Sequence, residues 1–130
     1  MTSGKRIFVV TCVDHRLFEK EFEACVPQGP YFFTFVGGAM NAITQFQSLV
    51  DQLTFLEEKG VIFDEGILAD HTNCAAHGGN ESKEDHYVLL DQLAEMLTEK
   101  YPSLEVRKCL INLETKQLED VPDNQFANAS

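Results

Sequence analysis

The chain has 130 residues, a length that fits one domain able to bury a core without disulfides. Ten Lys and Arg residues against 21 Asp and Glu residues give a formal net charge of −11. This acidity disfavours binding to nucleic acids and to anionic membrane surfaces. The sequence shows neither an apolar stretch long enough to cross a membrane nor a signal-peptide pattern, so we expect a single cytoplasmic domain over residues 1–130.

The first half of the chain alternates between strand-like and helix-like segments. Residues 6–14, RIFVVTCVD, predict a strand buried on both faces, and residues 17–25 predict a helix. Residues 31–38, YFFTFVGG, predict a second strand that runs into two glycines. From Asn41, a candidate N-cap, apolar residues at helical spacing predict one helix that ends at Gly60.

The second half continues the same alternation. Residues 61–70, VIFDEGILAD, predict a third strand that is bulged around Gly66. A capping-box pattern at Ser82 begins a second long amphipathic helix, which Pro102 stops. Two further strands are predicted over residues 103–114 and 116–121, followed by a tail.

Strands that alternate with helices predict an α/β fold. We expect one three-layer domain: a mostly parallel four-stranded sheet with helices on both faces and a short C-terminal antiparallel edge strand. In such sheets the ligand site lies beyond the carboxyl ends of the strands, where the winding reverses. If the strands at 6–14 and 61–70 are neighbours at that point, their exits share one crevice.

Side chains that bind metals follow these two strand exits. The segment CVDHR contains Cys12, and the segment HTNC contains His71 and Cys74. Two thiolates and one imidazole form a set that holds zinc tetrahedrally and leaves the fourth position for water. The alternative is three unrelated core residues, and it is disfavoured because the crevice geometry and the ligand chemistry agree independently.

Two charged residues alternate with Cys12 in the segment CVDHR. If the strand continues past Cys12, Asp14 and Arg16 lie on the same side as the thiol. A carboxylate held by a guanidinium stays ionised and weakly basic, so it is suited to accept a hydrogen bond from a zinc-bound hydroxide. A purely structural ion pair is the alternative interpretation.

The pattern Cys-x-Asp-x-Arg, followed much later by His-x-x-Cys, resembles the signature of the beta-class carbonic anhydrases. SLVDQLTFLEEKGV and INLETKQLEDV are also similar to parts of that family. The resemblance implies that Cys12, His71 and Cys74 bind zinc and that Asp14 with Arg16 forms the catalytic dyad. It implies reversible hydration of carbon dioxide to bicarbonate by zinc-bound hydroxide.

The resemblance also implies a homodimer or higher homo-oligomer. The aromatic side chains of Phe32, Phe33 and Phe35 supply more apolar surface than the edge of a small sheet easily hides. The expected small-molecule partner is carbon dioxide or bicarbonate.

Two alternative functions remain open. One is hydrolysis of carbonyl sulfide or carbon disulfide on the same scaffold. The other is a non-catalytic zinc-binding oligomeric protein, suggested by the absence of the helical arm that the family has before its first strand; there Asp14 or His77 would complete the coordination shell. The remaining candidates are interpreted as buried hydrophobes, turn residues, or packing and surface histidines: Cys25, Cys109, His77, His15 and His86.

Overall fold

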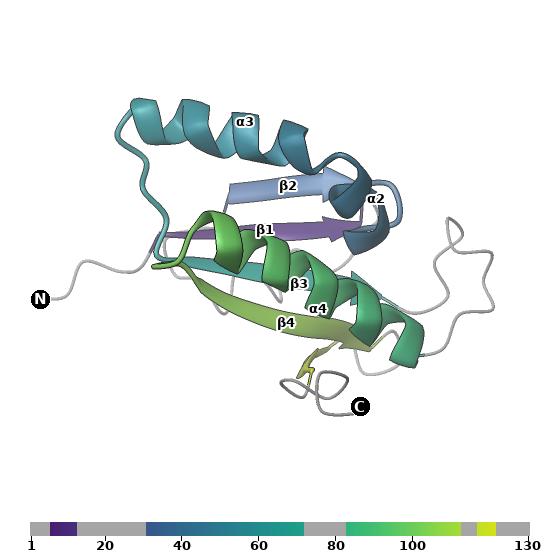
Figure 1. Ribbon diagram of the computed structural model, residues 1–130. Helices are drawn as coiled ribbons and strands as arrows, with labels where there is room; N and C mark the ends of the chain where they lie inside the picture. The colour runs from purple at the N-terminus through teal and green to yellow at the C-terminus, as the bar shows by residue number, and fades with distance from the viewer. Residues whose placement is uncertain (1–5, 13–30, 72–82, 113–116, 122–130) are drawn as a thin grey trace, which may run out of the picture.

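The computed structural model describes residues 6–12, 31–71, 83–112 and 117–121 (Figure 1). In chain order these residues form β1 (Ile7–Cys12), β2 (Tyr31–Phe35), α2 (Ala39–Thr44), α3 (Phe46–Glu58), β3 (Glu65–His71), α4 (Lys83–Lys100), β4 (Glu105–Asn112) and β5 (Gln117–Asp120). The sheet has the order β2-β1-β3-β4-β5. The first four strands in this order run parallel, and β5 pairs antiparallel with β4. The predicted α/β class and the antiparallel edge strand are confirmed.

The three described helices pack on one face of the sheet. Alternate strand residues such as Phe8, Val10 and Leu68 form one core cluster with the buried side chains of α2, α3 and α4. The intervening residues, including Val9 and Ile67, form a second cluster on the other face. Both faces of β1 and β3 are therefore shielded from solvent, as the sequence predicted. The helix expected over residues 17–25 lies outside the described residues.

The β3 strand runs without the bulge that was predicted at Gly66. Gly66 pairs in regular register with Phe8 on one side and Val106 on the other. A Cβ atom added to Gly66 would lie 2.5 Å from Cζ of Phe8. The glycine is needed because the Phe8 ring covers this position, not because the strand changes its pairing.

The predicted helix from Asn41 to Gly60 is two helices. The break falls at Gln45, whose φ of −107° and ψ of 32° leave the helical range. The helical segment also begins earlier than predicted, because Gly38 is the N-cap. The side-chain amide of Asn41 donates to the carbonyl of Val36. The helix end at Gly60 is confirmed: this residue has a φ of +91° and donates its N–H to a carbonyl of the last turn of α3.

The two helices bury different side chains. Helix α2 buries Ala39 and Ala42, and it packs mainly against α4. Helix α3 buries Leu49, Val50 and Leu53. Small residues in α2 permit close approach to a neighbouring helix, whereas the larger residues of α3 fill the core over the sheet. The chain therefore changes direction at the break although the apolar spacing continues through it.

The aromatic residues of β2 are used mostly inside the domain. Phe33 and Phe35 are 7% and 8% exposed and belong to the helix-covered core, and Phe32 packs against the core of the other face. The prediction that all three rings supply surplus apolar surface is wrong for Phe33 and Phe35, which are buried, whereas Phe32 is partly buried on the other face. No described helix is long and apolar enough to cross a membrane.

Candidate active site at the carboxyl edge of the sheet

Cys12 and His71 lie at the carboxyl ends of neighbouring parallel strands. β1 pairs directly with β3, and the register places Thr11 opposite Ala69. The arrowheads of β1 and β3 point to the same edge of the sheet (Figure 1). Chain order reverses here, because β2 lies on one side of β1 and β3 on the other. The predicted meeting of these two strand exits at the switch point is confirmed.

Both side chains are buried. Cys12 is 3% exposed and His71 is 5% exposed. By strand alternation, Cys12 lies on the helix-covered side with Val10, and His71 lies on the opposite side with Ala69. An ion held by both residues would therefore have to lie beyond the ends of the strands, and not over either face of the sheet.

The other predicted site residues lie outside the described part of the chain. Asp14 and Arg16 fall within residues 13–30, and Cys74 and His77 fall within 72–82. Within the described ranges, no group of three or more His, Cys, Asp or Glu side chains is arranged to hold a metal ion. The zinc ligand set and the dyad therefore stay predictions. Of the predicted ligands, the structure describes Cys12 and His71, at the ends of adjacent strands.

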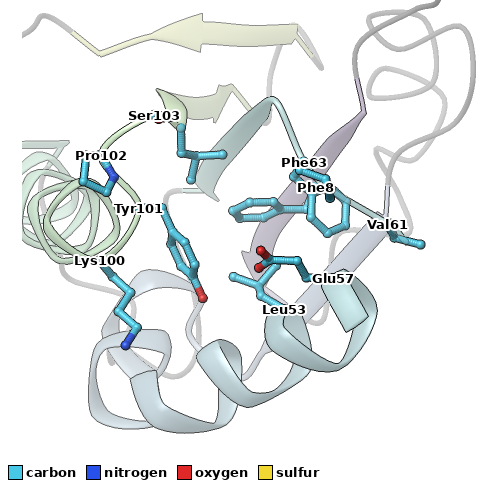
Figure 2. Close-up of a pocket in the computed structure, with 11 residues that line it drawn as sticks. Phe8, Leu53, Glu57, Val61, Phe63, Lys100, Tyr101, Pro102 and Ser103 are labelled. Atoms are coloured by element: carbon cyan, nitrogen blue, oxygen red, sulfur yellow. The ribbon is translucent and has the colours of Figure 1, made fainter. Parts of the chain in front are cut away.

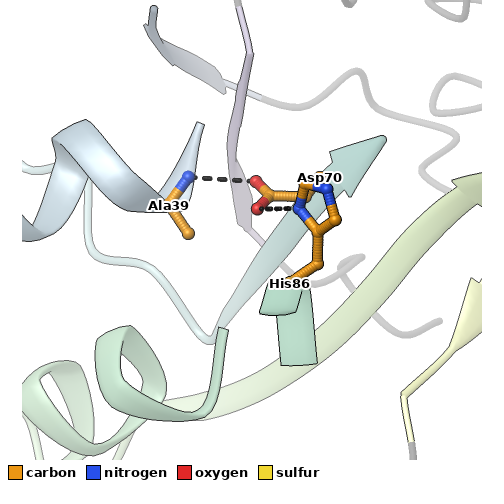
Figure 3. A network of polar contacts seen from close by, with 3 residues as sticks. All are labelled: Ala39, Asp70 and His86. Atoms are coloured by element: carbon orange, nitrogen blue, oxygen red, sulfur yellow. Dashed lines mark hydrogen bonds and ion pairs between the residues drawn. The ribbon is translucent and has the colours of Figure 1, made fainter. Parts of the chain in front are cut away.

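A second polar group beside this edge was not identified from the sequence. Asp70 is 2% exposed, and its two carboxylate oxygens have different partners (Figure 3). One oxygen accepts the backbone N–H of Ala39 at 2.9 Å, and the other lies 3.0 Å from Nδ1 of His86. A carboxylate can only accept hydrogen bonds, so Nδ1 carries the hydrogen of this contact. The pair joins β3, α4 and the first turn of α2.

Gly38 allows this close arrangement. Its φ is +63°, and an added Cβ atom would lie 2.2 Å from a carboxylate oxygen of Asp70 and 3.5 Å from the backbone nitrogen of Cys12. The turn before α2 therefore touches the ends of both β1 and β3. His86, expected from the sequence to be a packing or surface residue, is 1% exposed and paired with Asp70. An aspartate within an otherwise apolar strand was the signal for such a partner.

A separate pocket lies at the amino-terminal end of the sheet, away from the candidate site. It has a volume of about 290 Å³, and Figure 2 shows Phe8, Phe63 and Tyr101 among its lining side chains. Burial and the charge of Glu57 raise the pKa of Tyr101, against an opposing contribution from Thr54. The net effect is a pKa of Tyr101 above its ordinary value of 10.0.

Comparison with known proteins supports the fold. No family model matches the chain, and no curated protein matches it. Among solved structures, the chain is similar to a carbonic anhydrase from Glaciozyma antarctica, with a TM-score of 0.55 and 19% sequence identity. The similarity covers 94% of this chain and 85% of that chain. At this level of identity the likeness establishes a common α/β fold.

Proposed function

We propose that the protein is a zinc-dependent carbonic anhydrase whose active site lies at the carboxyl edge of β1 and β3. The main supporting observation is the direct pairing of these strands, which brings Cys12 and His71 to one end of the sheet. The fold similarity to a carbonic anhydrase supports the same proposal.

The chemistry of the donors fits zinc. A thiolate and an imidazole are ligands that Zn²⁺ prefers, and Cys12 and His71 provide them in a shielded environment. We propose Cys74 as the third ligand, three residues after His71 in the sequence. When bound, zinc would act as a Lewis acid that lowers the pKa of water.

The remaining roles belong to Asp14 and Arg16. The guanidinium of Arg16 would keep the carboxylate of Asp14 ionised and fixed in orientation. Asp14 would then accept a hydrogen bond from the attacking water and direct its lone pair towards carbon dioxide. Its low basicity would prevent it from retaining the proton. Attack of the water oxygen on carbon dioxide would form bicarbonate and release one proton, which would pass to solvent.

Elemental analysis and stopped-flow hydration of carbon dioxide test this proposal together. We expect one zinc per chain and a hydration rate above that of buffer at alkaline pH. Cys12→Ser should lose both. Cys109→Ser is the matched control, because Cys109 is also a buried strand cysteine but lies in the core cluster on the far face. A folded wild-type protein without zinc would overturn the metal site, and a zinc-loaded protein without hydration activity would overturn the enzyme assignment.

We also propose that the chain self-associates through the edge strand β2. Among the described strands β2 is an edge, and Tyr31, which begins it, and Val36, which directly follows it, are 38% and 58% exposed. The edge of a parallel sheet can pair with another copy of the chain. Size-exclusion chromatography with light scattering measures the mass directly, and a monomer at micromolar concentration would contradict the proposal.

A further inference from the structure

Asp70 and His86 lie beside the candidate metal site but have no part in the proposed chemistry. Asp70 immediately precedes His71 in β3, and strand alternation places the two side chains on opposite faces. His86 reaches Asp70 from the first turns of α4. Both members of the pair are almost completely buried, at 2% and 1% exposure.

We propose that Asp70 and His86 form a positioning pair that fixes the carboxyl end of β3 and thereby sets the orientation of His71. The inference rests on the proposed function, because it assigns the pair a role in presenting a metal ligand. Neither residue is placed on the metal or on the substrate. The pair is therefore distinct from the catalytic dyad proposed at Asp14 and Arg16.

The cost of burying the pair argues that it does more than fill space. A buried carboxylate is costly unless it is fully hydrogen-bonded, and apolar residues of similar volume often replace a buried ionic pair with no loss of stability. An apolar replacement cannot supply hydrogen bonds, which fix the orientation of a side chain. The two oxygens of Asp70 accept from Ala39 and His86, on two different helices, so the carboxyl group is held from two sides.

The restraint on Asp70 also restrains His71, the proposed metal ligand, through the backbone. Asp70 and His71 share a peptide group, so a fixed Asp70 limits the rotation of the strand end from which His71 projects. Gly38 closes the remaining space, because a Cβ atom there would lie 2.2 Å from the Asp70 carboxylate. The same Cβ position is 3.5 Å from the Cys12 backbone nitrogen, so the turn also abuts the strand end that bears the thiol.

Zinc affinity, measured by competition with a chelating dye, separates positioning from general stabilisation. We expect His86→Leu to weaken zinc binding by about 10-fold, the lower end of the effect of losing a residue that orients a metal ligand, because His86 acts on His71 only through Asp70. His86→Asn can retain a donor near the Nδ1 position and should restore most of the affinity. Asp70→Asn keeps an acceptor for the Ala39 N–H and should fall between them.

Lys108→Met is the matched control. Lys108 forms a largely buried ion pair with Asp91, which also joins α4 to the sheet but through β4. Its loss should lower the free energy of unfolding while leaving zinc affinity within about twofold, since the register partner of Lys108 in β3 is Leu68 and not Asp70. Equal changes in zinc affinity for His86→Leu and Lys108→Met would overturn the positioning role.

A second readout does not depend on metal. Long-range ¹H–¹⁵N spectra of the metal-free protein report the environment of the His71 ring. We expect His86→Leu to shift the His71 signals and Lys108→Met to leave them in place. Wild-type protein that takes up no zinc would overturn the proposed function alone, whereas unchanged His71 signals in His86→Leu would overturn the positioning pair.

Discussion

Nδ1 of His86 lies 3.0 Å from a carboxylate oxygen of Asp70, and both side chains are shielded from solvent. The contact joins a strand end to a helix that follows it after residues 72–82. Because the other oxygen of Asp70 accepts from Ala39, one carboxyl group links three elements.

Gly38→Ala should be strongly destabilising. The added Cβ would meet the Asp70 carboxylate at 2.2 Å, and the φ of +63° is unfavourable for any residue with a side chain. Strain and overpacking together should lower the free energy of unfolding by about 3–5 kcal/mol. Urea denaturation followed by circular dichroism measures this change.

Gly60→Ala separates the two causes. Gly60 has a φ of +91°, but nothing lies within 4 Å of an added Cβ. Only the strain of a positive φ remains, so the free energy of unfolding should fall by about 1 kcal/mol. Equal losses at Gly38 and Gly60 would contradict the close packing against Asp70.

Gly66→Ala should also destabilise the protein, by about 2–3 kcal/mol, because the new methyl group would lie 2.5 Å from the Phe8 ring. Phe8→Leu removes the ring edge at some cost of its own. In a double-mutant cycle the combined variant should be more stable than the sum of the single losses predicts. Strict additivity would argue against direct contact between these two positions.

The Arg107–Asp120 pair predicts a small pH dependence of stability. A hydrogen bond from Arg107 holds the pKa of Asp120 below its ordinary value of 3.8, against the opposing effect of burial. The stabilisation is therefore complete above about pH 4 and is lost as the pH falls through the lowered pKa. Asp120 is 68% exposed, so solvent screening limits the effect to less than about 1 kcal/mol.

Arg107→Met is the variant that measures this effect. Its free energy of unfolding should fall below that of the wild type at pH 7, and the difference should shrink between pH 4 and pH 2. Thermal unfolding at several pH values provides the comparison. A difference that grows on acidification would show that the sign is wrong.

Tyr101 should ionise later than an ordinary tyrosine. Burial and the charge of Glu57 raise its pKa above 10.0, with an opposing contribution from Thr54. The folded protein should therefore lose stability as the pH rises above 10, where the unfolded chain releases the proton more readily. Phenolate absorbance at alkaline pH, with Tyr101→Phe subtracted, isolates this group. Glu57→Gln should move its titration to lower pH.

The strand order at the candidate site was predictable because the signals are local. Apolar runs identify β1 and β3, and the sequence argument required that they be neighbours at the switch point, a condition that the strand order fulfils. The helix break at Gln45 was not predictable, because apolar residues continue at helical spacing through it. The break is set by the different packing partners of α2 and α3. The pairing of Asp70 with His86 depends on where α4 lies over the sheet, which no local pattern encodes.

Only some of the predicted site residues can be compared with the structure. Cys12 and His71 were located because each stands at the end of a recognisable strand. Asp14, Arg16 and Cys74 lie outside the described residues, so their roles rest on the sequence pattern alone. Sequence reasoning is most secure where a residue's position follows from the strand that precedes it.

The pairing of β1 with β3 joins residues that are far apart along the chain, such as Ile7 and Glu65. Neither half of the polypeptide contains both Cys12 and His71, so no fragment formed early during synthesis could assemble the proposed pocket. Ion capture would have to wait until β3 has emerged from the ribosome and paired with β1, and the bound metal would then mark chains in which these two distant strands have met.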